Sequence, residues 1–174
     1  MPSITTTTMI WLREADPDVS PFRYLQGSPN VYIDGPRGLP LVKPPWGRIT
    51  AIDLNTGEHV WMRPNGPGPR DHIALQDLEL PWLGAPGRAA PLLTKTLLFL
   101  GDGSRSMQVL PPHAGGRMFR AFDKATGRVL WQTELEAGTS GAPMTYMHDG
   151  KQYVVVAISE RDHEGELVAF ALPE

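Results

Sequence analysis

The chain has 174 residues, a formal net charge of −3 and no cysteine. The length fits one domain, and the lack of cysteine excludes disulfides and cysteine-ligated zinc. The slight negative charge gives no reason to expect nucleic acid or an anionic membrane surface as a partner. Eighteen glycines and eighteen prolines favour short strands joined by turns over long helices. The first nine residues lack the basic and apolar regions of a signal peptide, and no segment is long and apolar enough to span a bilayer.

The N-terminal segment, residues 1–45, has an irregular pattern. Residues 5–12 (T-T-T-T-M-I-W-L) are rich in β-prone side chains and form one candidate strand. Residues 28–45 are rich in proline and glycine, which indicates a loop or an extended linker. Two interpretations stay open: this segment is cut from a larger fold, or it is a disordered N-terminal arm.

An eleven-residue pattern occurs twice, at residues 51–61 (A-I-D-L-N-T-G-E-H-V-W) and 121–131 (A-F-D-K-A-T-G-R-V-L-W). Such self-similarity is the mark of a repeat architecture. The aspartate can accept hydrogen bonds from nearby backbone N–H groups, and the Thr-Gly pair closes a turn in which glycine supplies a positive φ. Each copy therefore predicts a hairpin that ends on a tryptophan covering a neighbouring sheet. The shared positions are Ala51, Asp53, Thr56, Gly57 and Trp61 in the first copy and Ala121, Asp123, Thr126, Gly127 and Trp131 in the second.

The rest of the sequence predicts one further loop and two groups of strands. Residues 65–82 form a loop with a short helical or irregular insert. Residues 83–135 predict four strands, at 88–93, 96–100, 118–123 and 128–134, and the continuous apolar run at 97–100 suits a strand buried on both faces. Residues 138–174 predict three strands, at 142–148, 152–159 and 166–172, with a hairpin turn at Asp149-Gly150 and a polar loop at 161–165.

Several patterns that resemble functional sites are better explained by turns and loops. Asp53-x-Asn55-x-Gly57 begins like an EF-hand loop, but Pro64 occupies the position of the essential glutamate. The acidic loop carrying His72 has no recognised ligand spacing; its carboxylates are Asp71, Asp77 and Glu79. The G-D-G-S sequence at residue 101 lacks the Lys-Ser/Thr ending of a phosphate loop. No histidine is assigned as a metal ligand.

The repeated pattern A-x-D-x-x-T-G-x-x-x-W resembles the tryptophan-docking motif of the quinoprotein dehydrogenases. The segments P-P-W-G-R-I-T-A-I-D-L-N-T-G (residues 44–57) and A-P-M-T-Y with D-G-K-Q-Y-V-V (residues 142–155) resemble the membrane-bound glucose dehydrogenase type. The resemblance begins near residue 39. It implies an all-β fold that is a partial β-propeller, with about two and a half four-stranded blades of an eight-bladed ring. Residues 46–64 would be the second half of a blade, 83–135 a complete blade, and 138–174 the last blade without its fourth strand.

The resemblance also implies a function. Proteins of this type hold pyrroloquinoline quinone (PQQ) and Ca²⁺ in the central funnel, oxidise an aldose or an alcohol, and work in the periplasm. Their catalytic aspartate and Ca²⁺ ligands lie on earlier blades, and nothing in this chain matches those motifs. We therefore expect no catalysis and no tight binding of PQQ or Ca²⁺ by this chain alone. Missing blades, from the same polypeptide or from a partner chain, would complete the ring.

One residue is a candidate cofactor contact. Arg88 starts the inner strand of the penultimate blade, a position that faces the funnel in the family, and its guanidinium could pair with a PQQ carboxylate or quinone oxygen. The alternative is a surface arginine at the end of a loop. A second functional hypothesis is a non-catalytic propeller module built from the same repeat, with a scaffold or assembly role.

Overall fold

The strands of the computed structural model form five antiparallel sheets within the described residues, which are 1–4, 8–27, 31–104 and 114–173. The first sheet has the order β1 (Pro2–Ile4), β6 (Gly47–Ile52), β7 (His59–Pro64). The central sheet has the order β11 (Val129–Glu134), β10 (Met118–Asp123), β9 (Leu97–Gly101), β8 (Leu92–Leu93). The third sheet has the order β12 (Met144–His148), β13 (Lys151–Glu160), β14 (His163–Ala171). These sheets confirm the all-β prediction.

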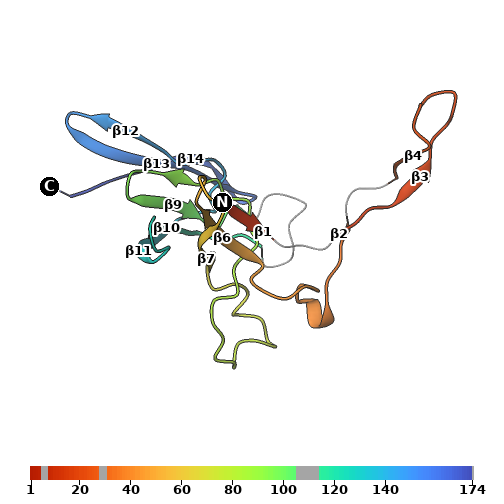
Figure 1. Cartoon of the computed structure of the whole chain (residues 1–174), viewed down its shortest axis with the longest axis horizontal. Helices are drawn as coiled ribbons and strands as arrows, with labels where there is room; N and C mark the ends of the chain where they lie inside the picture. Colours follow the sequence, from red (N-terminus) through yellow and green to blue (C-terminus); the bar gives the residue numbers. More distant parts are fainter. Residues whose placement is uncertain (5–7, 28–30, 105–113, 174) are drawn as a thin grey trace.

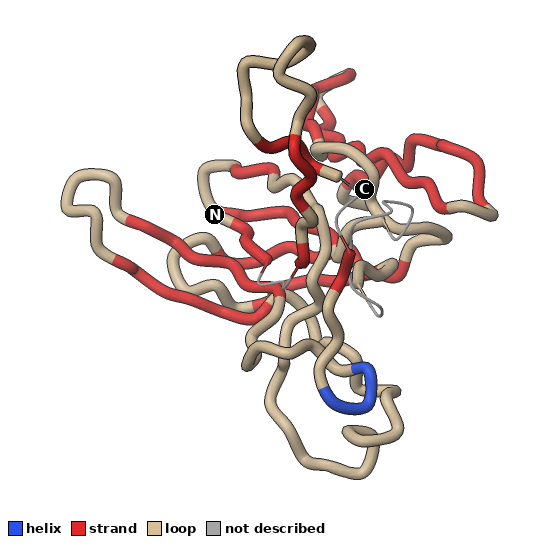
Figure 2. The backbone as a smooth tube through the Cα atoms, turned by 90° about the vertical axis from the view of Figure 1, so that its right-hand side faces the viewer, coloured by secondary structure: helices blue, strands red, loops and turns tan. Residues whose placement is uncertain are grey.

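The N-terminal segment forms two small hairpins. One pairs β2 (Thr8–Met9) with β5 (Val31–Tyr32), and the other pairs β3 (Leu12–Glu14) with β4 (Tyr24–Gln26). Figure 1 shows the β3–β4 hairpin projecting away from the three larger sheets. The one helical turn among the described residues, Pro36–Gly38, lies apart from the sheets in a loop (Figure 2). No described helix has the length and apolar character that crossing a bilayer requires.

The observed strands differ from the predicted ones in several places. The candidate strand at 5–12 is replaced, in its described part, by two short strands, β2 and the start of β3, and residues 5–7 lie outside the described part. β1 was not predicted, because its partner β6 lies more than forty residues along the chain. The predicted strand at 88–93 is reduced to β8, since Pro91 has no N–H to donate to a ladder. The predicted polar loop at 161–165 is a tight turn, because Glu160 pairs directly with His163.

The central sheet is covered on both faces. Leu98, Leu100 and Phe122 pack toward Ile49 of the first sheet, while Phe119 on the opposite face of β10 packs with residues of the third sheet. β9 therefore contributes to both clusters, as the apolar run at 97–100 predicts, with Phe99 on the side of the third sheet. The cluster between the central and third sheets also contains Leu135, Ala137, Val156 and Ile158.

The two copies of the repeat form the same local structure. Each is a hairpin, β6–β7 or β10–β11, with a β-bulge directly after its alanine. In the first copy Asp53 Oδ1 accepts a hydrogen bond from the Asn55 amide at 2.8 Å. In the second, Asp123 Oδ1 accepts from the amide and the hydroxyl of Thr126, at 2.8 and 3.0 Å. These contacts explain why a short acceptor side chain precedes each turn.

Trp61 joins the first sheet to the central sheet. Its Nε1 donates a hydrogen bond to the carbonyl of Lys124 at 3.0 Å. Its indole ring covers Gly127 so closely that a methyl group there would lie 2.7 Å from the ring. The tryptophan of one copy thus rests on the glycine turn of the next. Gly57, the corresponding glycine of the first copy, has nothing within 4 Å of where a methyl group would be.

Trp131 occupies the equivalent position between the central and third sheets. Its ring meets Phe170 of β14 edge-on, with centroids 5.4 Å apart, and it also meets Phe119 at 6.3 Å. Trp131 thus packs on a phenylalanine of the third sheet, whereas Trp61 packs on a turn glycine of the central sheet. Such edge-to-face pairs stabilise packing beyond their buried area.

The glycine pair gives a matched test of this packing. Both Gly57 and Gly127 have positive φ, so alanine at either position costs about 1 kcal/mol of backbone strain. Only at Gly127 must the new methyl group also displace the Trp61 ring. We expect Gly57→Ala to destabilise the chain by about 1 kcal/mol and Gly127→Ala by about 3 kcal/mol, since overpacking adds to the strain. Urea unfolding measures both, and equal losses would contradict the stacking.

The turn carboxylate gives a pH-dependent prediction. The hydrogen bonds from the Thr126 amide and hydroxyl lower the pKa of Asp123. The unfolded pKa is about 3.9, so the ionised carboxylate stabilises the fold above that pH, and the contribution is lost as the pH falls through the lower folded pKa. Asp123→Asn should therefore have a lower free energy of unfolding than wild type at pH 7. This difference in free energy of unfolding should shrink as the pH falls below about 4.

Urea unfolding at pH 7, 5, 4 and 3 measures this gap. Asp77→Asn removes the same charge from an exposed loop and should change stability at pH 7 by less than Asp123→Asn. A gap between wild type and Asp123→Asn that is the same at pH 3 as at pH 7 would contradict the prediction.

Candidate functional site

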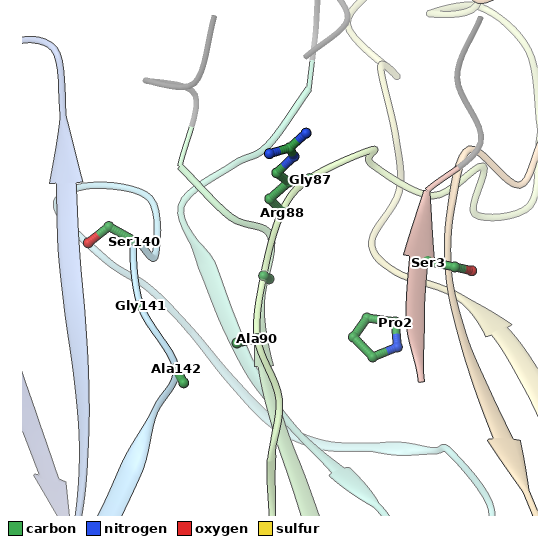
Figure 3. Close-up of a pocket in the computed structure, with 9 residues that line it drawn as sticks. Pro2, Ser3, Gly87, Arg88, Ala90, Ser140, Gly141 and Ala142 are labelled. Atoms are coloured by element: carbon green, nitrogen blue, oxygen red, sulfur yellow. The ribbon is translucent and has the colours of Figure 1, made fainter. Parts of the chain in front are cut away.

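A groove of about 620 Å³ lies where the three larger sheets converge. Figure 3 shows the segment 87–90 running through its middle, with β1 on one side and the start of the third sheet on the other. The lining comes from three separate parts of the chain, so the groove exists only because the sheets stack. Its residues are Pro2, Ser3, Gly87, Arg88, Ala89, Ala90, Ser140, Gly141 and Ala142.

The described lining of the groove is small and almost entirely neutral. Arg88 is the single charged side chain among these lining residues, and it is exposed to solvent. Its side chain lies at one end of the groove, while Ala90 and Ala142 mark the other end (Figure 3). A wide space with narrow side chains and one guanidinium suits a flat ligand with an anionic group. The sequence analysis singled out Arg88, and the structure places it on this surface.

The middle of the groove is fixed by close backbone contacts. Gly87 lies against the carbonyl of Asp102, where a methyl group would be 1.8 Å from the oxygen. The Gly115 amide donates to the carbonyl of Pro86 at 2.8 Å. Any residue larger than glycine at position 87 would move the segment out of this place. The sequence reading did not identify this requirement.

A buried ion pair lies directly behind this segment. Arg120 Nη1 contacts Asp102 Oδ1 at 2.5 Å, and the two residues are 1% and 5% exposed. Arg120 Nε also donates to Gln132 Oε1 at 3.3 Å, and the guanidinium lies over the Trp82 ring, 5.4 Å from its centre. Sequence reasoning missed this pair, although one signal was present: an arginine in the otherwise apolar strand M-F-R-A-F (residues 118–122).

The G-D-G-S segment connects the central sheet to the third sheet. The Ser104 amide donates to the carbonyl of Thr139 at 2.8 Å, and its hydroxyl donates to the carbonyl of Ser159 at 2.7 Å. These two hydrogen bonds join the segment to the third sheet. Thr139 is buried, and its hydroxyl has no hydrogen-bond partner among the described residues.

The other rejected patterns are structural as well. His72 Nδ1 accepts a hydrogen bond from the backbone amide of Ala74 at 3.1 Å. The other ring nitrogen, Nε2, therefore carries the hydrogen and donates it to the carbonyl of Arg37 at 2.9 Å. The Asp53 carboxylate closes its own turn. In the part of the chain that the structure describes, no three His, Asp or Glu side chains come together in a way that could hold a metal ion.

Comparison with known proteins identifies the family. The family model "Glucose/ethanol/alcohol dehydrogenase, beta-propeller domain", of the PQQ type, matches residues 16–154. The chain belongs to the PQQ β-propeller family. The partial β-propeller fold that the resemblance implied is thereby confirmed for this PQQ-family chain.

The relatives of this PQQ-family chain are quinoprotein dehydrogenases. It is 34% identical over 150 residues to quinoprotein glucose dehydrogenase of Escherichia coli (strain K12), covering 80% of this chain and 17% of that protein. It is 34% identical over 145 residues to quinate/shikimate dehydrogenase (quinone) of Acinetobacter baylyi, covering 78% of this chain and 16% of that protein.

A solved structure shows a similar coverage. Quinohemoprotein alcohol dehydrogenase from Comamonas testosteroni matches with a TM-score of 0.48 and 23% identity, covering 78% of this chain and 18% of that one. The chain thus spans less than a fifth of the length of these proteins.

Two hydroxyls at the junction with the third sheet should respond oppositely to removal. Thr139→Val deletes a buried hydroxyl without a partner and keeps the side-chain shape, so we expect it to stabilise the chain by about 1 kcal/mol. Ser104→Ala deletes a hydroxyl that donates a hydrogen bond, so we expect a loss of about 1 kcal/mol. Urea unfolding of the two variants provides the comparison. A loss of stability in Thr139→Val would show that the hydroxyl is satisfied.

Proposed function

We propose that this chain forms part of the wall of a PQQ site in a quinoprotein dehydrogenase that oxidises an aldose or an alcohol. The observation that carries the proposal is the groove, because it is built from segments beside three successive sheets and presents one guanidinium among small neutral residues. The family match at residues 16–154 includes the two lining segments of the central and third sheets.

The residues of the groove fit one end of PQQ. This cofactor is a flat quinone with carboxylate groups, and when bound it supplies the acceptor for the hydride of the substrate. Arg88 would hold a carboxylate or a quinone oxygen by a charge-assisted hydrogen bond. Ala89, Ala90 and Gly141 leave room beside it, and no acidic side chain among the described lining residues opposes an anion.

The described residues do not fit Ca²⁺, which takes six to eight oxygen ligands, several of them carboxylates. No suitable group of Asp, Glu or His side chains lies together in the described ranges. We therefore assign the Ca²⁺ ligands and the general base to other parts of the dehydrogenase and derive no catalytic step for this chain. On this proposal the chain contributes cofactor contacts and closes one side of the funnel.

Other blades are the partners that the proposal requires. On the first sheet Val60 and Met62 are 59% and 51% exposed, and the turn at Gly57 has space where Gly127 is covered by Trp61. On the third sheet β14 is an edge strand with Leu167 exposed. By the docking pattern of the repeat, we propose that a tryptophan of a preceding blade covers Gly57 and that a fourth strand pairs with β14. The family resemblance favours a periplasmic location.

The test is PQQ binding by the polypeptide that carries this segment in its source cells. Arg88→Leu should weaken PQQ binding at least about tenfold, the equivalent of a lost hydrogen bond to a charged group. Arg117→Leu is the matched control, because Arg117 is an exposed arginine paired with Glu134 at 3.0 Å; it should bind PQQ like wild type. Equilibrium dialysis or quenching of tryptophan fluorescence gives both affinities.

Two outcomes would count against the proposal. Binding by Arg88→Leu within twofold of wild type would remove Arg88 as a contact. A complete absence of PQQ binding by the wild-type polypeptide would overturn the dehydrogenase assignment and favour the scaffold function.

A further inference from the structure

We propose that the buried Asp102–Arg120 pair is a positioning element for the groove, which fixes the backbone at Gly87 and thereby the place of Arg88. Neither Asp102 nor Arg120 is a lining residue of the groove, and the pair acts through the backbone of Asp102, which lies against Gly87. As a statement about cofactor binding this inference rests on the proposed function. As a statement about the shape of the groove it does not.

The burial of the pair needs an explanation other than stability. Taking a carboxylate and a guanidinium out of water is costly, and a buried pair is often no more stabilising than apolar residues of the same size. Such a pair does impose a particular geometry, because each charge must meet its partner. Arg120 and Asp102 are among the least exposed residues of the chain, so a positional role is the better account.

Arg120 holds Asp102 from a rigid base. Arg120 lies in β10, which is paired on both sides within the central sheet. Its guanidinium is fixed at three places: by Asp102, by Gln132 of β11 and by the Trp82 ring. A planar guanidinium with three such contacts cannot move with the carboxylate without losing one of them. The side chain of Asp102 is therefore anchored to the middle of the sheet.

The backbone beside Asp102 contacts the segment that lines the groove. Its carbonyl oxygen lies against Gly87, and the next residue, Gly103, lies against the backbone of Arg88. On the other side the carboxylate is enclosed by Gly66 and Gly116, where added methyl groups would lie 3.2 and 2.6 Å from its oxygens. A shift of Asp102 would therefore change the backbone contacts that hold Gly87 and Arg88 in place.

The repeat itself does not require the pair. In the first copy Thr50 stands where Arg120 stands in the second, directly before the shared alanine. Thr50 is buried as well, and its amide donates to the carbonyl of Met1 at 2.9 Å. The hairpin of the repeat therefore forms with or without the arginine. The ion pair belongs to the sheet that carries the middle of the groove.

The test measures the distance across the groove. This segment has no cysteine, so in the polypeptide from the source cells, with any cysteine outside the segment replaced by serine, nitroxide labels on Ala90→Cys and Ala142→Cys attach only at the two chosen lining positions and leave Arg88 intact. The distance distribution between them is recorded by electron paramagnetic resonance, without PQQ, in three backgrounds: wild type, Arg120→Met and Arg117→Met. The last removes an exposed arginine from the same part of the sheet.

We expect Arg120→Met to broaden the distribution at least twofold or to shift its mean, and Arg117→Met to leave it as in wild type. If Arg120→Met does not fold, Asp102→Asn replaces it, because the amide keeps the size of the carboxylate and removes the charge that pairs with Arg120. An unchanged distribution in the folded variant of this pair would overturn the inference.

PQQ affinity of the same variants, measured in the polypeptide from the source cells, separates the two proposals. A changed distance distribution with unchanged PQQ affinity supports the positioning role and counts against Arg88 as a cofactor contact. A changed distribution together with at least threefold weaker PQQ binding supports both.

Discussion

The fold depends on one contact between blades, the indole of Trp61 resting on the turn at Gly127. The hydrogen bond from Trp61 Nε1 to Lys124 fixes the direction of the ring, and the glycine gives the ring room. Because the tryptophan and the glycine belong to successive copies of one repeat, a single sequence pattern sets both the hairpin and the spacing of the sheets. The groove follows from that spacing, since its lining comes from all three blades.

The same arrangement leaves the first and third sheets each with an uncovered face. The central sheet is covered on both faces, whereas the first and third sheets each have one covered face and exposed apolar side chains such as Met62 and Leu167. Open edges and uncovered faces are what a closed ring of blades removes. The relatives are about six times longer than the segment they share with this chain, which is consistent with further blades that cover these surfaces.

The sequence was most informative where the structure is local. The two copies of the repeat predicted both hairpins, and the apolar run at 97–100 predicted a strand with core on each side; these are short-range patterns. The sequence was uninformative about β1, because its pairing with β6 depends on a segment far away in the chain. The predicted length of the strand before Thr94 was wrong, and β8 begins only after Pro91, which has no N–H to donate to a ladder.

The candidate site was partly predictable for a similar reason. Arg88 was identified through the resemblance to the family, and the structure places it on the groove. The Asp102–Arg120 pair was not identified, since its two members lie eighteen residues apart in the sequence. Only the fold shows that the carboxylate of one and the guanidinium of the other meet behind the same segment.

The central claim is that these three sheets are part of a larger ring of blades. The most direct test is the size of the native polypeptide, by immunoblot of source cells with an antibody raised against residues 121–131, whose turn is exposed at Lys124, Ala125 and Thr126. The account predicts a band several times larger than a 174-residue chain. A band at the size of this chain would contradict it.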